Sequence, residues 1–131
     1  LWDLASVSKV VATTSLAAMA VDRGVLDLAA PVREFWPESR FAGPVRDLLL
    51  HEAGYPAFRP YHLLAKSWGA VVRMVAQEAG GGKNVYSDLS MIALAEILER
   101  LEGRRLDEAF AARIARPLGL AATGYRPRQN G

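Results

Sequence analysis

The sequence contains no cysteine, which excludes disulfide bonds and cysteine-ligated zinc sites. It has two histidines, His51 and His62, too few for a convincing histidine cluster around a metal ion. No apolar run reaches the length of a bilayer-spanning helix, so we expect no membrane span. The 16 basic and 14 acidic residues are spread along the chain and leave a net charge of +2. Without a basic stripe, nucleic acid is not an expected partner, and no cofactor site is indicated.

Strand signals are scarce, and the sequence has no internal repeat and no low-complexity tract. Its 131 residues are 51% hydrophobic and 23% charged, which is typical of a folded domain rather than a disordered chain. We therefore predict a single domain over residues 1–131. The sequence begins with Leu1 instead of methionine and shows no signal sequence, so we expect a piece of a longer protein. Compartment and oligomeric state stay open.

Apolar residues at helical spacing predict a mainly α-helical chain. We expect helices over residues 5–22, 45–51, 68–79, 87–102 and 107–116. The first of these is apolar over much of its circumference, so we expect it at the centre of the domain. Gly24 and Gly103 suit left-handed C-terminal caps, and Ser87 or Asp88 suits an N-cap. Trp36 is expected to pack in the core.

The first predicted helix opens with Ser6-Val7-Ser8-Lys9, a Ser-x-x-Lys pattern. Residues three apart lie on one helical face, so the Ser6 hydroxyl and the Lys9 amine can meet. At the start of a helix, unpaired N–H groups and the positive end of the helix dipole stabilise a nearby anion. This combination can activate a serine as a nucleophile and stabilise an oxyanion. The alternative interpretation of the four residues alone is a capping serine followed by a solvated lysine.

His51 falls in the last turn of the predicted helix 45–51, where its side chain would interact with free carbonyl groups. We assign it this structural role and not a catalytic or metal-binding one. Gly80-Gly81-Gly82 precedes Lys83, but no strand comes before it and no Gly-Lys-Ser/Thr follows, which argues against a phosphate-binding loop.

Four features then occur in order along the chain: Leu4-Ala5-Ser6-x-x-Lys9, Leu49-Leu50-His51-Glu52-Ala53-Gly54, Tyr86-Ser87-Asp88, and Arg116-Pro117-Leu118-Gly119-Leu120 with Thr123. With them the sequence resembles the serine β-lactamase and penicillin-binding-protein superfamily. It looks most similar to the branch of class C β-lactamases, D-alanyl-D-alanine carboxypeptidases and β-lactamase-like esterases. The resemblance implies the helical portion of an α/β fold, with most of the sheet absent from this chain.

The resemblance also implies roles for individual residues. Ser6 would be the acyl-accepting nucleophile and its backbone N–H half of the oxyanion hole, while Lys9 and Tyr86 would handle the proton. A free tyrosine has a pKa of about 10 and is a poor base at pH 7, but an adjacent ammonium favours the phenolate. Which of the two takes the Ser6 proton stays open. Substrates would be β-lactams, D-amino-acid peptides or small esters, without metal or cofactor.

Two departures from the family pattern matter. Asp88 stands where the family usually has asparagine; an ionised aspartate accepts hydrogen bonds but donates none. We expect Asp88, as a substrate-binding residue, to pair with Lys9, to favour Tyr86 as the base and to shift preference from β-lactams toward esters. The family's Lys-Thr-Gly or His-x-Gly strand is also missing. We therefore expect the isolated chain to have little activity and an apolar face that is exposed or covered in a homodimer.

Two other hypotheses remain. In the first, the chain is a non-catalytic relative of the family and keeps the β-lactamase-like scaffold for binding or assembly. Alternatively, the motifs arise by chance in a plain helical bundle, which predicts that Ser6 and Tyr86 lie far apart.

Overall fold

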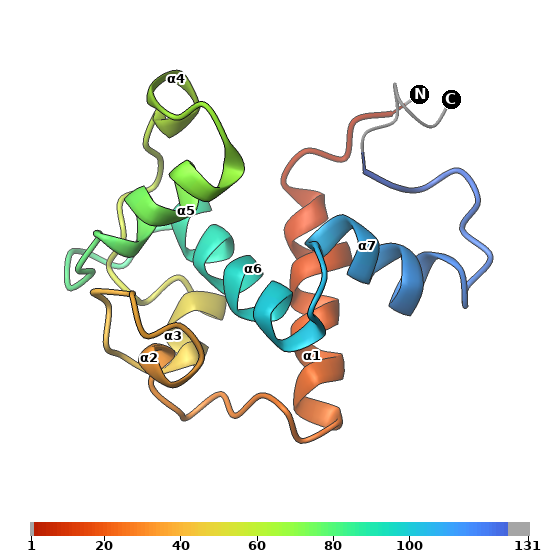
Figure 1. Ribbon diagram of the computed structural model, residues 1–131, viewed down its shortest axis with the longest axis horizontal. Helices are drawn as coiled ribbons and strands as arrows, with labels where there is room; N and C mark the ends of the chain where they lie inside the picture. The colour runs from red at the N-terminus through yellow and green to blue at the C-terminus, as the bar shows by residue number, and fades with distance from the viewer. Residues whose placement is uncertain (1, 126–131) are drawn as a thin grey trace.

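The computed structural model describes residues 2–125, a cluster of helices without a strand in that range (Figure 1). Residue 1 and residues 126–131 of the predicted domain lie outside the described residues. In chain order the helices are η1 (Lys9–Thr14), α1 (Ser15–Asp22), α2 (Val32–Phe35), α3 (Val45–Leu49), α4 (Tyr61–Leu64), α5 (Trp68–Ala76), α6 (Asp88–Glu102), α7 (Leu106–Phe110) and η2 (Ala111–Ala115), where η denotes a π-helical stretch. The prediction of a mainly helical chain is confirmed.

Helix α6 is the element against which the others pack. It contacts η1, α1, α2, α3, α5 and α7, and in Figure 1 it runs through the middle of the molecule. The Ser87 side chain caps its N-terminus, and Gly103 ends it in a left-handed conformation with φ of +63°. Its buried side chains are Leu89, Ser90, Met91, Ala93, Leu94, Ala95, Ile97 and Leu98.

The first helix is continuous from η1 into α1. The sequence predicted that it would lie at the centre of the domain, and it does not. One side, with Ala12, Leu16, Ala17 and Ala20, is buried. Elsewhere on this helix and just before it, Val7, Val10 and Val21 are exposed, Val10 by 64%. The apolar residues spread over more of the circumference than the neighbouring helices cover. The central position therefore goes to α6, which has neighbours on several sides.

Two predicted helices end earlier than expected. Helix α3 stops at Leu49 because His51 adopts a left-handed backbone with φ of +58°, which no helix can accommodate. Helix α5 stops at Ala76, ahead of the glycine triplet. The predicted last helix is divided into α7 and the π-helical η2. Trp36, expected in the core, is 1% exposed.

Glu102, the last residue of α6, ties three helices together. Its side chain is 3% exposed and pairs with Arg23, just after α1, and with Arg113 of η2 at 3.1 Å. Burial alone would raise the pKa of Glu102, but hydrogen bonds from Arg113 and Arg23 lower it. The carboxylate is therefore charged at neutral pH and holds the ends of these helices against one another.

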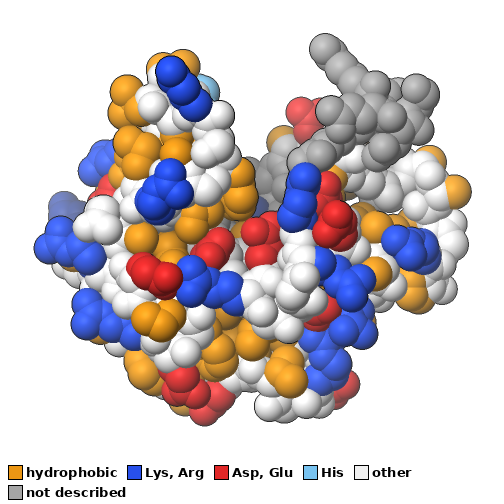
Figure 2. Space-filling model, viewed as in Figure 1, with side chains coloured by type: hydrophobic (Ala, Val, Ile, Leu, Met, Phe, Trp, Pro, Cys, Tyr) orange, Lys and Arg blue, Asp and Glu red, His pale blue; other side chains and the backbone are white. Residues whose placement is uncertain are grey.

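Figure 2 shows positive and negative side chains interspersed on one face, with apolar side chains gathered over α4. The exposed apolar residues at and near α4 are Phe58, Leu63 and Leu64. Within residues 2–125, no helix combines the length and apolarity needed to cross a membrane.

Candidate active site

Ser6 and Lys9 lie at the entrance to the first helix, in a tight turn. The N–H groups of Ser8 and Lys9 donate to the carbonyl groups of Ala5 and Ser6, each three residues earlier. Asp3 fixes the start of this turn, since its Oδ1 accepts from the Ala5 N–H at 2.8 Å. The Lys9 Nζ donates to Ser6 Oγ at 2.9 Å. Spacing alone predicts this local contact, and the structure contains it.

Tyr86 and Asp88 reach the same place from the N-terminal end of α6. Asp88 Oδ1 lies 2.7 Å from Lys9 Nζ, and the Lys9 ammonium lies 5.1 Å from the centre of the Tyr86 ring. A hydrogen bond joins the Ser6 and Tyr86 side chains. The predicted Lys9–Asp88 pair is therefore present. The hypothesis of chance motifs, which requires Ser6 and Tyr86 to be far apart, is wrong.

The charges in this cluster shift the pKa values of both proton-handling groups. The hydrogen bond with Ser6, followed by the hydrogen bond and charge of Lys9, lowers the pKa of Tyr86. Burial alone would lower the pKa of Lys9, but hydrogen bonds with Asp88 and Tyr86 and their charges raise it. Lys9 is consequently an ammonium at neutral pH and cannot take a proton in that state. Tyr86 is the group whose basic form the surroundings favour.

The cluster is open to solvent. Ser6 is exposed, Tyr86 is 57% exposed, and the Lys9 side chain is 15% exposed. A shallow hollow of about 290 Å³, lined in part by His51 and Tyr86, adjoins it. A nucleophile on an open surface can meet substrate directly, but the described residues do not enclose it.

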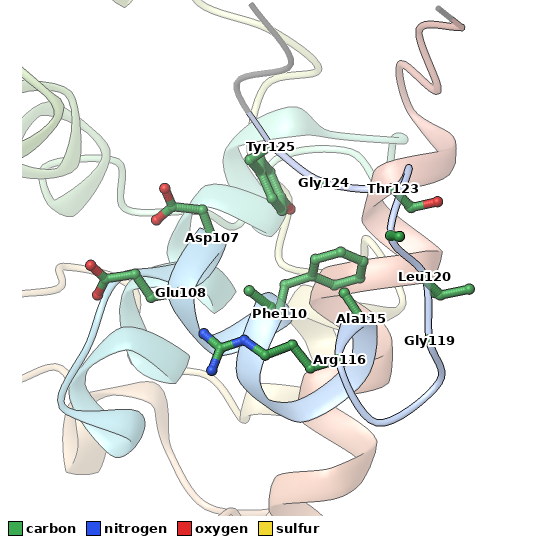
Figure 3. Close-up of a pocket in the computed structure, with 12 residues that line it drawn as sticks. Asp107, Glu108, Phe110, Ala115, Arg116, Gly119, Leu120, Thr123, Gly124 and Tyr125 are labelled. Carbon is green, nitrogen blue, oxygen red and sulfur yellow. The ribbon is translucent and has the colours of Figure 1, made fainter. Parts of the chain in front are cut away.

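The fourth sequence feature does not join this cluster. Arg116, Gly119, Leu120 and Thr123 line a different cavity of about 610 Å³, beside α7 and η2. Figure 3 shows Phe110 and Tyr125 among the side chains around it. Ser6 is not among the described residues that line this cavity.

His51 contacts the site, although the sequence analysis assigned it to the end of a helix. Its Nδ1 accepts a hydrogen bond from the Ser87 N–H at 3.0 Å, and its ring lies 4.5 Å from the Tyr86 ring. Because Nδ1 accepts, the neutral ring carries its proton on Nε2. Burial and then the nearby Lys9 charge lower the pKa of His51. The signal that could have identified it was its place in the segment Leu49-Leu50-His51-Glu52-Ala53-Gly54, one of the four features shared with the family.

The glycine triplet has a packing function. The N–H groups of Gly81 and Gly82 donate to the carbonyl groups of Ala53 and Gly54. A Cβ on Gly54 would lie 2.3 Å from the Gly82 nitrogen, so only glycine permits this approach of two backbones. The segment that carries His51 is thereby fastened to the segment that leads to Tyr86.

A model of the family named Beta-lactamase matches residues 1–131. The chain belongs to the beta-lactamase family.

Among the described residues, no group of three or more His, Asp or Glu side chains is arranged to hold a metal ion.

Individual relatives agree with this assignment. Proteins of Salmonella agona and Salmonella newport, each named "Putative D-alanyl-D-alanine carboxypeptidase", are 28% identical over 152 aligned positions. The alignments cover 100% of this chain and 35% of either relative, so the chain spans about a third of their length. The crystal structure of FmtA from Staphylococcus aureus matches 86% of this chain and 34% of its own, with a TM-score of 0.74 and 22% identity. That likeness shows a shared fold.

Proposed function

We propose that this chain supplies the nucleophile and the proton-transfer groups of a serine hydrolase that works by acylation and deacylation. The observation that carries the proposal is the position of Lys9 Nζ, 2.9 Å from Ser6 Oγ and 2.7 Å from Asp88 Oδ1. Family membership supports hydrolase chemistry of this class. The chain spans about a third of the length of these relatives. The activity is therefore proposed for the full-length protein, by which we mean the longest natural chain that contains these residues.

In the proposed acylation, Ser6 Oγ forms a bond to the substrate's carbonyl carbon and its proton passes to the Tyr86 phenolate. Lys9 stays protonated and stabilises that phenolate, while Asp88 neutralises the lysine charge. Tyr86 then returns the proton to the departing alcohol or amine. In deacylation, Tyr86 takes a proton from water, the hydroxide adds to the acyl carbon, and Ser6 leaves with the proton restored.

The proposed substrates are small esters, D-amino-acid peptides and β-lactams. Asp88 bears on the choice among them, because its carboxylate already accepts from Lys9 and has no N–H to offer an amide carbonyl. A substrate that needs such a donor, as a β-lactam or peptide does in this family, loses one hydrogen bond. We therefore propose a preference for esters.

The test is covalent labelling of the full-length protein with a fluorophosphonate and with a penicillin, followed by intact-mass measurement and peptide mapping. We expect one adduct, on Ser6, and none in Ser6→Ala. Ser8→Ala is the matched control, because Ser8 lies on the same turn and its hydroxyl donates to the Ala5 carbonyl. A folded protein that takes up neither probe at Ser6 would instead favour the non-catalytic scaffold.

A further inference from the structure

Two residues of the candidate site have an unusual backbone. Among residues 2–125, the non-glycine residues with positive φ are Ala5, at +42°, and His51, at +58°. A residue with a Cβ adopts this conformation at a cost, and such residues collect where function requires a fixed geometry. Ala5 precedes the proposed nucleophile, and His51 contacts the proposed base. This places strain on both sides of the same cluster.

The His51 side chain makes two contacts with the segment that carries the base. Its Nδ1 accepts from the N–H of Ser87, the residue after Tyr86. Its ring lies 4.5 Å from the Tyr86 ring, with an angle of 46° between the planes. One contact fixes the backbone beside Tyr86, and the other limits where the phenol ring can lie.

The backbone that holds His51 is itself fixed against the same segment. Three residues further on, Gly54 packs directly on Gly82, where no side chain fits. Beyond it, the carbonyl groups of Pro56 and Ala57 accept from the Ser87 hydroxyl at 2.6 Å and from the Asp88 N–H at 2.9 Å. These contacts all follow the histidine within six residues and attach its segment to the one that carries Tyr86, so His51 projects from a fixed frame toward Tyr86.

We infer that His51 is a positioning residue, which holds Tyr86 against Ser6 and Lys9 through its ring and its Nδ1 acceptor. The inference rests on the proposed function, because it gives Tyr86 its orientation as the base. It requires the neutral ring: a proton on Nδ1 turns the acceptor into a donor that opposes the Ser87 N–H. The groups that face the ring are the Lys9 ammonium, the Asp88 carboxylate and the Tyr86 phenol, with Glu52 adjacent in sequence.

The test compares three substitutions in the full-length protein, measuring the rate of fluorophosphonate labelling at Ser6 across pH. His51→Phe keeps a ring without the acceptor, and His51→Gly keeps the left-handed backbone without either contact. We expect both to lower the rate at neutral pH by about tenfold to a hundredfold, as a misplaced catalytic group does. His51→Asn tolerates the left-handed backbone and offers an amide oxygen, so it should recover much of the rate and lose the fall at acid pH that His51 protonation causes. The control, His62→Asn, changes the other histidine.

A second measurement does not depend on activity. Titration of the Tyr86 phenol, from ultraviolet difference spectra against Tyr86→Phe, should give a pKa in His51→Gly that is higher than in the unsubstituted protein, toward about 10. An unchanged phenol pKa would overturn the inference, as would labelling of His51→Gly and His51→Phe at the unsubstituted rate. If the unsubstituted protein is not labelled at all, the proposed function fails, and the phenol titration still decides whether His51 positions Tyr86.

Discussion

Replacement of Ser87 by alanine should destabilise the chain far more than the same replacement three residues later. Ser87 is fully buried, and its hydroxyl makes three hydrogen bonds at the start of α6. The oxygen accepts from the N–H groups of Leu89 and Ser90 at 3.1 and 3.3 Å, and the O–H donates to the Pro56 carbonyl at 2.6 Å. A single atom therefore caps the central helix and attaches it to the loop after α3.

The magnitude follows from these contacts. Loss of an N-cap acceptor costs about 1 kcal/mol. Loss of the donor to a partly buried carbonyl costs about 1 kcal/mol more. We expect Ser87→Ala to lower the free energy of unfolding by about 2 kcal/mol. Ser90 is also buried, at 1% exposure, but its hydroxyl has no partner among the described residues. Ser90→Ala should therefore change the free energy of unfolding by less than about 0.5 kcal/mol.

The assay is urea unfolding of the 131-residue chain, followed by far-ultraviolet circular dichroism at low protein concentration. Both variants lose one hydroxyl from a buried position, so the difference between them isolates the hydrogen bonds. Equal midpoints for Ser87→Ala and Ser90→Ala would refute the reasoning, because the cap and the Pro56 contact would then contribute nothing measurable.

Four further predictions follow from the same structure. Glu102→Gln should lower the free energy of unfolding by about 2 kcal/mol at neutral pH, measured by urea unfolding. Because the pKa of Glu102 is lowered in the folded state, the contribution of its carboxylate to stability is lost as pH falls through that pKa. The unsubstituted protein and Glu102→Gln should therefore become equally stable in acid. Gly54→Ala should lower the free energy of unfolding by about 3 kcal/mol in the same assay. Gly24 has the same left-handed backbone but open space around it, so Gly24→Ala should lower it by about 1 kcal/mol. Similar losses of stability in the two variants would contradict the close packing at Gly54. Asp88→Asn should raise the ratio of nitrocefin to ester hydrolysis in the full-length protein, and no gain would count against the assigned role of the carboxylate. The isolated chain should be helical, with an apolar face that is exposed or covered in a homodimer, and should hydrolyse neither nitrocefin nor p-nitrophenyl acetate; rapid hydrolysis abolished by Ser6→Ala would show this to be wrong.

Local features were predictable from the sequence. The contact between Ser6 and Lys9 follows from a separation of three residues at a helix start. The boundaries of α6 follow from a capping serine before it and a glycine after it, since each satisfies backbone groups within one turn. Interactions of this kind involve neighbours in the chain, so residue types and spacing are sufficient to find them.

Long-range features were not predictable in the same way. The sequence places His51 near the end of a helix, but its partners Tyr86 and Ser87 lie 35 and 36 positions away. The choice of α6 over the first helix as the central element likewise depends on which faces find neighbours, and apolar periodicity alone does not specify this. Nor does the order of motifs reveal that Thr123 lines a separate cavity.

The glycine triplet links these two kinds of information. Read locally, Gly80-Gly81-Gly82 follows a predicted helix, and without a preceding strand or a Gly-Lys-Ser/Thr it does not indicate a phosphate-binding loop. In the fold the triplet packs against Gly54, because the two backbones can approach this closely only where both residues lack a side chain. That contact brings the segment with His51 alongside the segment with Tyr86, and the hydrogen bonds of Ser87 continue the attachment to the start of α6. The frame behind His51 is therefore built in part from glycines, which carry no reactive group. This is why a search for reactive residues in the sequence finds Ser6, Lys9 and Tyr86 but not the contacts that bring their segments together.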